Sequence, residues 1–559
     1  MNHGMKNRIL FFIFLLLCAC KAQKTGEGEA LHPSEQGRQE PIPAGKRPVD
    51  AWGFWPGVER LPLGESGAWF PRSVYGSDLP ILDFPEGKPP HTLGDVRIIR
   101  PESASSWEEA GINDGRWSYF LITPGDYRSW GPLVLKRSGS ARARRILRYY
   151  DPKSRSPYKP PHPVQMSGDA RREVLLESFE TAGADYWVLH GLTFRGKASK
   201  KRGLQGGLTS KMKPGSDYNI IDYCLFEQFL GLAAIRILQA NHNLIQRCVF
   251  RDKVEGVGVD MGGIVISARE GEEARGNLIV GNEFYNLSDA VGLLYNVPRK
   301  GNRAANSQTG SVPATVIENN DIYIQPRLYV QKSDGEWACA EDGLDIKVGT
   351  KSTRPEDQIR ILNNRIWGFR PTDQSCGGSG STGVGILLHR QASNILIKGN
   401  IIFNTAQGIV VFGDNPKKPG EKVENITIEN NLIYDIRHSV KRAQIGLALK
   451  LIAPCRVEYN TVCKAEQLLF VHKKQSRHEM RHNIFKDIRQ PVEDLSMPSG
   501  FVCEANMWVH VPESAIIHRG DERDRVAGPK DKLKWRDYTI YCRRWTGPEQ
   551  VVFEGVLLK

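Results

Sequence analysis

A short acidic segment that ends in a lysine carries the residue types best suited to chemistry. It reads EDGLDIK and contains Glu341, Asp342, Asp345 and Lys347. Clustered carboxylates suit calcium, which takes several hard oxygen ligands in a loose geometry. We therefore predict a calcium site made by the three carboxylates, with Asn296 as a further ligand. The alternative is a metal-free acidic cluster whose charge is balanced by Lys347, Arg390 and their neighbours.

Two more titratable side chains, His389 and Arg390, follow where the next structural repeat is expected. Together with Lys347 they provide what β-elimination of a uronate-containing glycan requires. The substrate carboxylate must be neutralised, a base must take the C5 proton, and the O4 leaving group needs a proton. We predict Lys347 as the base, activated by nearby cations that lower its pKa, Arg390 as the carboxylate clamp, and His389 as an assisting acid. For each residue the alternative is a solvated polar side chain.

The elements that must position these residues are copies of one short strand that begins with glycine. The copies are GIVIS from Gly263, GLLYN from Gly292, GLDIK from Gly343, GILLH from Gly385, GIVVF from Gly408 and GLALK from Gly446. Successive strand residues face opposite sides, so the first and third residues after glycine point inward and the second and fourth point outward. Alignment on the glycines gives one outward column in the fourth position: Ser267, Asn296, Lys347, His389, Phe412 and Lys450. We expect Asn296, Lys450 and the second-position Asp345 to bind substrate on this face.

A column of asparagines fixes the register of the repeats. Aligned segments such as VIENNDI, RILNNRI and TIENNLI place these residues in one column: Asn282, Asn320, Asn364, Asn400, Asn431, Asn460 and Asn483, preceded by Cys224 and Cys248. Self-similarity at a spacing of a few tens of residues is typical of repeat proteins, and short β-rich units must stack because they cannot bury a face alone. Asparagine suits the repeated turn because it tolerates left-handed backbone and its amide can bond the amide one coil away. We predict an all-β protein, a parallel β-helix built from PbH1-type repeats.

One long solenoid with appendages is expected, because a solenoid grows along one dimension and escapes the usual limit on core size. The predicted segments are a signal region 1–20, a flexible tether 21–50, an irregular lead-in 51–91, the β-helix 92–500 and a C-terminal tail 501–559. The tether is rich in Gly, Pro, Glu and Gln, a composition typical of flexible stalks. We expect the tail to fold back on the helix, and its sequence assigns it no role.

The amino terminus has the organisation of a secretory signal. Lys6 and Arg8 precede the apolar run 9–17, which is too short to span a bilayer as a helix. The following Leu-Cys-Ala-Cys resembles a bacterial lipobox, which implies cleavage before Cys20 and lipidation of its thiol. The alternative is an ordinary signal peptide. We expect an exported bacterial lipoprotein of the cell envelope, held at the outer membrane by lipid and facing the periplasm or the cell surface.

The remaining cysteines suit a compartment that permits disulfides. Cys224 and Cys248 share one column on successive coils, so they either pair as a disulfide or stack as buried thiols. Cys339 and Cys376 each lie in a loop before a strand of successive coils, so they could tie those loops together. The sequence has no CxxC pair after the signal region and no His-rich cluster, so structural zinc is not expected.

The formal net charge of +13 favours an acidic partner. No basic repeat, RNP-like motif or zinc finger indicates nucleic acid. An acidic polysaccharide fits both the charge and the expected compartment, although surplus Lys and Arg are also typical of a solvated surface. We therefore expect a monomer that binds an acidic polysaccharide and meets a membrane only through a lipid anchor.

The asparagine ladder, the PGDY segment and the YWVLHGLTF segment resemble right-handed parallel β-helix polysaccharide lyases, especially the alginate lyase and chondroitinase B family. In that family, acidic calcium ligands precede a lysine base and an arginine follows one coil later. The matching residues in this sequence are Glu341, Asp342, Lys347 and Arg390, with Asn296 at the family's asparagine ligand. The spacing between acid and lysine differs from the family's signature strand. EDGLD also resembles the calcium motif of a β-helix pectate lyase family, but Leu387 stands where that family has its lysine base.

The same scaffold serves several activities, so the fold does not settle the function. A glycoside hydrolase needs two carboxylates about 5 to 10 Å apart, and the predicted outward face offers Asp345 alone. The DPHE-type motif of alginate epimerases is absent from the sequence. We predict a polysaccharide lyase; the alternatives are a non-catalytic glycan-binding or structural β-helix lipoprotein, and a glycoside hydrolase.

Overall fold

The computed structural model describes the chain from residue 96 onward, with gaps. The described residues are 96–141, 143–199, 203–205, 210–229, 233–253, 262–295, 310–324, 340–370, 383–413, 422–437, 446–471, 478–492, 501–509, 511, 525–527, 540–545 and 551–556. The predicted signal region, tether and lead-in lie outside them, as do Cys20, Asn296, Cys339 and Cys376. Within the described part, no helix has the length and apolar character needed to cross a membrane.

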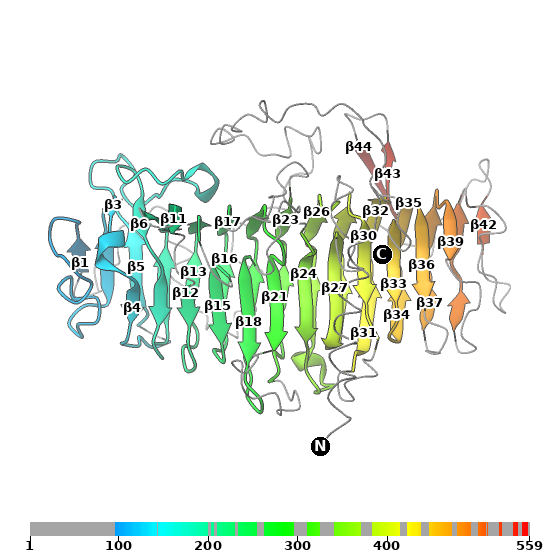
Figure 1. The fold of residues 1–559 in the computed structure, drawn as a ribbon, viewed down its shortest axis with the longest axis horizontal. Coiled ribbons are helices and arrows are strands. Elements are labelled where there is room, and N and C mark those ends of the chain that lie inside the picture. The colour runs from blue at the N-terminus through cyan, green and yellow to red at the C-terminus, as the bar shows by residue number, and fades with distance from the viewer. Residues whose placement is uncertain are drawn as a thin grey trace, which may run out of the picture. The chain divides into compact units, whose positions relative to one another are not determined.

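Three parallel sheets, called A, B and C here, form the walls of a stack of coils (Figure 1). A typical coil contributes one strand to each sheet in turn, as β19, β20 and β21 do. Neighbouring strands of one sheet therefore come from successive coils, and their residues pair in parallel register. The parallel β-helix predicted from the sequence is confirmed.

The strands of sheet A are β1 (Val96–Ile99), β2 (Tyr119–Ile122), β5 (Arg145–Tyr149), β8 (Trp187–His190), β13 (Ile220–Asp222), β16 (Leu244–Gln246), β19 (Leu278–Val280), β22 (Val316–Glu318), β25 (Ile359–Leu362), β28 (Ser393–Lys398), β31 (Glu424–Glu429), β34 (Cys455–Glu458), β37 (Glu479–Arg481) and β40 (Val502–Glu504). The strands of sheet B are β3 (Gly125–Asp126), β6 (Val174–Leu176), β9 (Thr193–Arg195), β14 (Leu225–Glu227), β17 (Val249–Arg251), β20 (Glu283–Tyr285), β23 (Asp321–Tyr323), β26 (Arg365–Trp367), β29 (Ile401–Phe403), β32 (Leu432–Ile436), β35 (Thr461–Ala465), β38 (Ile484–Lys486), β41 (Met507–Val509) and β42 (Arg525–Ala527).

The strands of sheet C are β4 (Leu133–Leu135), β7 (Phe179–Thr181), β12 (Ser210–Met212), β15 (Ile235–Leu238), β18 (Ile264–Ala268), β21 (Val291–Tyr295), β24 (Asp342–Val348), β27 (Val384–Gln391), β30 (Gln407–Val411), β33 (Leu447–Leu451), β36 (Gln467–Val471) and β39 (Gln490–Val492). Two antiparallel hairpins stand apart from these sheets: β10 (Lys197–Ser199) with β11 (Gly203–Gln205), and β43 (Ile540–Trp545) with β44 (Val551–Val556). Short 3-10 turns occur at Arg128–Trp130, Pro163–Gln165 and Pro355–Asp357.

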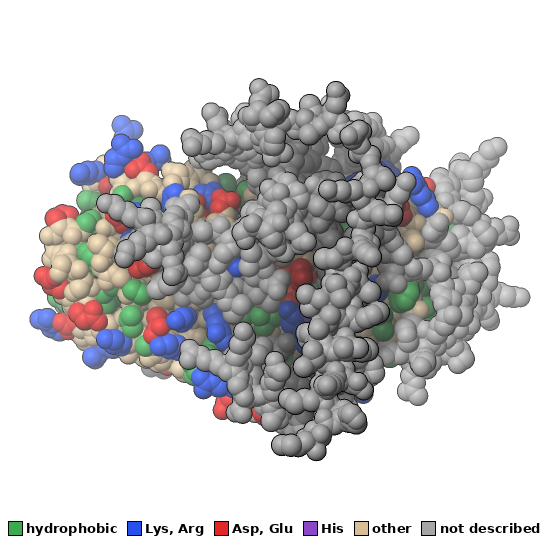
Figure 2. Space-filling model, in the orientation of Figure 1, with side chains coloured by type: hydrophobic (Ala, Val, Ile, Leu, Met, Phe, Trp, Pro, Cys, Tyr) green, Lys and Arg blue, Asp and Glu red, His purple; other side chains and the backbone are tan. Residues whose placement is uncertain are grey.

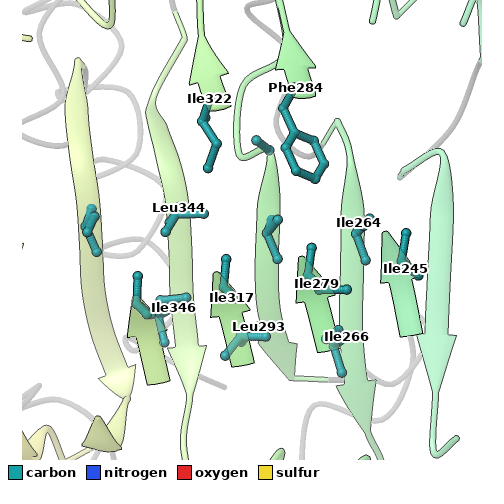
Figure 3. Packing of buried hydrophobic residues seen from close by; sticks show 14 of the residues in the cluster. Ile245, Ile264, Ile266, Ile279, Phe284, Leu293, Ile317, Ile322, Leu344 and Ile346 are labelled. Atoms are coloured by element: carbon teal, nitrogen blue, oxygen red, sulfur yellow. The ribbon is translucent and has the colours of Figure 1, made fainter. Parts of the chain in front are cut away.

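The core fills the space between the three sheets. Aliphatic side chains of sheets A and C point toward one another there, and side chains of sheet B complete the packing (Figure 3). Ile279, Ile317 and Leu344, from successive parts of this core, are fully buried. Each such side chain contributes roughly 1.5–3 kcal/mol through burial, so repetition along the stack holds the fold together.

The asparagine ladder runs along the turn between sheets A and B, as predicted. From Asn282 to Asn483, each amide Nδ2 donates to the Oδ1 of the ladder asparagine one coil later, at 2.9–3.1 Å. The last of these bonds reaches Asn506, which extends the ladder by one member that the sequence alignment missed. The same Nδ2 atoms also donate to backbone carbonyls, for example from Asn364 to Ile317 at 2.9 Å.

Left-handed backbone occurs one residue before the ladder position, not at the ladder asparagine itself. Asn319, Asn363 and Asn430 have φ of 54°, and Tyr459 and His482 occupy the same place with φ of 58° and 55°. The two properties of asparagine are therefore divided between adjacent positions, one for the backbone turn and one for the amide stack. A second, shorter column, Asn219, Asn243 and Asn277, precedes strands of sheet A and was not predicted.

Cys224 and Cys248 continue the ladder column as free, buried thiols. The backbone N–H of Cys224 donates to the Sγ of Cys248 at 3.4 Å. Burial raises the pKa of the Cys248 thiol well above its ordinary value, so it stays protonated and inert. Of the two alternatives left open by the sequence, the structure contains the stacked thiols.

Two strands of sheet C pair in a register that differs from the alignment on glycines. β21 is displaced by two residues, so Leu293 lies opposite Ile346 and not opposite Leu344. β33 is displaced by two residues in the opposite direction, so Lys450 lies opposite Val410. The predicted alignment on glycines is therefore wrong at these two coils, and Lys450 does not belong to the predicted fourth-position column. A shift of two keeps every side chain on its original side of the sheet, so the inward and outward pattern is unaffected.

The stack also continues past residue 500, where the tail was expected to begin. Strands β40, β41 and β42 extend sheets A and B, and Trp508 of β41 is fully buried in the common core. Asn506 joins the ladder between them. The first part of the predicted tail is thus a further coil.

Candidate active site

Strands β24 and β27 of sheet C bring the predicted catalytic residues together. Asp345 pairs with Leu387 and Ile346 with Leu388, but the register then shifts, since Val348 pairs with Gln391. The extra residue falls at His389 and Arg390, and Arg390 adopts the left-handed conformation with φ of 61°. Such a bulge redirects side chains. Here it sets His389 beside the carboxylate of the preceding coil.

Asp345 is the centre of this arrangement. Its side chain is almost fully buried, and Oδ1 lies 2.8 Å from His389 Nε2. The second oxygen, Oδ2, forms an ion pair with Lys347 Nζ. The Lys347 and His389 side chains keep 16% and 22% of their surface exposed, so they are the members of this group that solvent reaches. One buried carboxylate thus holds two partly exposed nitrogen groups in place.

The charges of this group stabilise one another. Burial by itself would raise the pKa of Asp345, but the hydrogen bond from His389 and the charge of Lys347 lower it. Burial by itself would lower the pKa of Lys347, but the charge and hydrogen bond of Asp345 raise it. The expectation that neighbouring cations lower the pKa of Lys347 is therefore wrong, because its neighbours are carboxylates. Lys347 is held as an ammonium ion.

Three further acids, called the acidic trio here, lie beside this centre: Asp289, Glu341 and Asp342. Their potential ligand atoms all lie within 4.8 Å of one another. Asp289 precedes β21 on the previous coil, and its backbone N–H donates to the Asp342 carbonyl at 2.9 Å. Ser288 Oγ donates to Asp289 Oδ1 and accepts from the Glu341 N–H, which ties the two coils together at this point.

The trio has the properties of a cation site. Asp289 and Asp342 are fully buried, and no hydrogen-bond donor among the described residues reaches either carboxylate oxygen of Asp342. Burial and the charge of Asp345 raise the pKa of Asp289 to about 7. Burial and the charge of Asp289 raise the pKa of Asp342 well above its ordinary value. Close carboxylates, of which the buried Asp342 has no donor among the described residues, suit a hard divalent cation such as calcium, which would replace the protons.

The structure changes the predicted set of metal ligands. Glu341 and Asp342 belong to the trio, but both oxygens of Asp345 are directed at His389 and Lys347. Asn296 lies outside the described residues. Asp289 was missed. Asp289 lies two residues before Val291, and Asp342 lies two residues before Leu344. Because Val291 pairs with Leu344, this equal spacing is the signal that could have found Asp289.

Lys450 lies on the same sheet but in another column than predicted. It pairs with Val410 on one side and Phe470 on the other. Its Nζ lies 5.1 Å from the centre of the Phe412 ring and 5.7 Å from that of the Phe470 ring. Figure 2 shows this face of the molecule, on which acidic and basic side chains of the described residues adjoin one another near the middle.

The chain is similar to known proteins in structure and not in sequence. No protein-family model matches the chain, and no curated protein matches it. Solved structures do: a mannuronic acid specific polysaccharide family 6 lyase from human gut microbiota has 13% identity and a TM-score of 0.45, over 78% of this chain and 91% of that one. An alginate lyase from Paenibacillus sp. str. FPU-7 has 10% identity and a TM-score of 0.31, over 74% and 99%.

A further similar structure is not a lyase. The catalytic domain of a GH87 alpha-1,3-glucanase in complex with nigerose has 12% identity and a TM-score of 0.40, over 75% of this chain and 69% of that one. Lyases and a hydrolase thus occur together among structures that this chain is similar to. Identities of this size concern the fold, so the chemistry must be argued from the residues of the site.

Proposed function

We propose that this protein cleaves an acidic, uronate-containing polysaccharide by β-elimination at Asp345, Lys347 and His389. The observation that carries the proposal is the buried Asp345 carboxylate, which pairs with a partly exposed imidazole and a partly exposed ammonium group. β-elimination needs a base and an acid on one face of the substrate, together with a positive charge for its carboxylate. His389, Lys347 and Arg390 together supply the base, the acid and the positive charge.

The hydrogen bond to Asp345 assigns the roles. When Nε2 of His389 donates to Asp345, the proton is on Nε2 and the Nδ1 atom is the basic one. His389 Nδ1 takes the C5 proton, the electron pair forms the C4–C5 double bond, and the C4–O4 bond breaks. Lys347, held as an ammonium ion, gives a proton to O4. These two roles reverse the assignment made from the sequence, while Arg390 keeps its proposed role at the substrate carboxylate.

Calcium in the acidic trio is part of the proposal. The trio offers carboxylate oxygens from two coils, and the Asp342 oxygens have no donor among the described residues. A bound calcium ion would supply positive charge next to the centre, where an anionic substrate must be accommodated. The residues that would hold it are Asp289, Glu341 and Asp342.

Hydrolysis fits the site less well. Asp289, Asp342 and Asp345 are each at most 1% exposed, so these carboxyl groups do not reach a polymer at the surface. A glycosidase requires one carboxyl as acid and a second as base or nucleophile, both in contact with substrate. Within the described residues, Glu341 is the one partly exposed carboxyl of this site, so a second one is lacking, and the other partly exposed groups are an imidazole, an ammonium and a guanidinium.

The test is incubation with a panel of uronate polymers. We expect ultraviolet absorbance from a 4,5-unsaturated uronate with at least one polymer, and a rise slower by roughly 100-fold or more with the His389→Ala variant. New reducing ends without that absorbance would replace β-elimination by hydrolysis. Binding of a polymer with neither product would leave a glycan-binding protein.

Export and lipid anchoring complete the proposal. The sequence motif that ends at Cys20 favours a lipoprotein held at the cell envelope. Mass spectrometry of the mature amino terminus should find a lipidated Cys20, and Cys20→Ala should release the protein from the membrane fraction. An unmodified terminus produced by cleavage at another position would refute the anchor.

A further inference from the structure

Lys450 occupies an unusual position on the outer side of sheet C. Its side chain lies between two phenylalanine rings from neighbouring coils, with Nζ 5.1 Å from the Phe412 centroid and 5.7 Å from the Phe470 centroid. The residue is only 5% exposed, whereas both rings are half-buried. Ring faces attract a cation electrostatically, so the two rings fix the ammonium group in one place.

This cluster, Phe412, Lys450 and Phe470, adjoins the proposed active site. The centroids of the Phe412 and His389 rings are 6.2 Å apart, so Phe412 contacts both groups. Lys450 and Asp345 belong to one column of sheet C, separated by Leu387 and Val410. Three strand spacings along this column correspond to about 14 Å, which is longer than one sugar ring. The cluster is therefore placed to meet a sugar that is not the one being cleaved.

We propose that Phe412, Lys450 and Phe470 form a subsite for a second carboxylate-bearing sugar of the same chain. The ammonium group pairs with the sugar carboxylate, and the two rings offer apolar surface to the C–H groups of the sugar. A fixed, poorly solvated ammonium ion binds a carboxylate better than a freely hydrated one, because less solvent and side-chain freedom are lost on binding. The substrate then extends from His389 toward the C-terminal coils. The inference rests on the proposed function, since it assumes an acidic glycan.

Binding to a defined oligouronate tests the subsite without turnover. His389→Ala removes catalysis, and calorimetry in that background measures the affinity for an oligomer long enough to span both positions. Adding Lys450→Met should weaken binding by roughly 10-fold to 100-fold, the usual cost of losing a charged hydrogen bond. Lys398→Met is the matched control, because Lys398 lies on sheet A in an ion pair with Glu429, and it should leave affinity unchanged.

Two further variants separate recognition from packing. Lys450→Arg keeps the charge and should retain most of the affinity, while Phe470→Leu should weaken binding with Lys450 still present. A carboxyl-reduced oligomer of the same length should bind weakly and equally to the proteins with and without Lys450→Met. An unchanged affinity for the acidic oligomer in Lys450→Met would overturn the proposal, as would an equal loss for both oligomers.

The outcome is independent of whether the protein is a lyase. Charge-dependent binding through Lys450 without any unsaturated product would refute β-elimination and support the subsite. Turnover that is insensitive to Lys450→Met at every oligomer length would support β-elimination and refute the subsite. Wild-type protein that binds no oligouronate would overturn the subsite.

Discussion

The asparagine ladder and the acidic trio both bring like side chains from successive coils together, with opposite results. A ladder amide carries a donor and an acceptor, so each Asn satisfies its neighbours, as Asn364 does with Asn320 and Asn400. An ionised carboxylate only accepts, so the Asp342 oxygens are left without a donor among the described residues, and burial and the charge of Asp289 raise the pKa of Asp342. Stacking therefore yields stability where the repeated group is self-complementary, and a candidate cation site where it is not.

The largest effect should come from His389, which the Asp345 carboxylate beside the trio holds in place. If His389 is the base, His389→Ala should lower kcat by roughly 100-fold to 10,000-fold, the usual contribution of a general base. The rate of unsaturated product formation is the measurement, and an unchanged Tm shows that the stack is intact. His482→Asn, a histidine stacked on Tyr459 at a turn, is the control that should keep full activity. Full activity in His389→Ala would refute the assignment.

The ladder should respond in stability and not in chemistry. Asn364→Ala removes bonds to Asn400 and Ile317 and leaves donors of Asn320 unpaired, which should cost about 2–5 kcal/mol of unfolding free energy. Chemical unfolding midpoints measure the loss. Asn363→Gly, at the adjacent left-handed position, keeps the backbone geometry and should cost much less. Equal losses in the two variants would show that the amide stack is not what stabilises the turn.

A buried histidine should make the stack sensitive to acid. His478 lies in the core with neither ring nitrogen paired among the described residues, and burial lowers its pKa to about 4. The unfolded chain takes up the proton near pH 6.5, so stability is full above that pH and falls as the pH drops toward 4. The loss should approach about 3 kcal/mol. His478→Leu should flatten the decline of Tm between these pH values, and an unchanged decline would assign it to other groups.

Calcium should have the smallest effect on stability, and it should separate the acidic trio from the asparagine ladder most sharply. Excess calcium should raise stability by about 2.7 kcal/mol at 100 times the Kd, and chelation should remove that gain. Asp289→Asn should abolish the calcium-dependent rise in Tm. Asp321→Asn, which breaks an ion pair with Arg365 on sheet B, should lower Tm but leave the calcium response intact. If exhaustive chelation changes neither activity nor Tm, the trio is not a calcium site.

Most of the fold was readable from the sequence because the ladder recurs once per coil. The aligned asparagines identify every coil from Asn282 to Asn483, and each predicted neighbour is hydrogen-bonded to the next. The acidic segment and the pair His389 and Arg390 were also recognised from the sequence, because titratable residues clustered so closely indicate a functional site. Asn506 was missed because Cys503 stands three residues before it, where the aligned segments have Ile, Val or Met.

The sequence by itself determined the architecture, the coil boundaries and the side of each strand that faces the core. Only the tertiary structure decided the register of β21 and β33, because a displacement by two residues preserves the alternation that a sequence pattern records. That displacement brought Asp289 beside Asp342 and separated Lys450 from the His389 column. The roles proposed for Lys347 and His389 also rest on the tertiary structure, since they follow from which oxygen of the buried Asp345 carboxylate each side chain contacts.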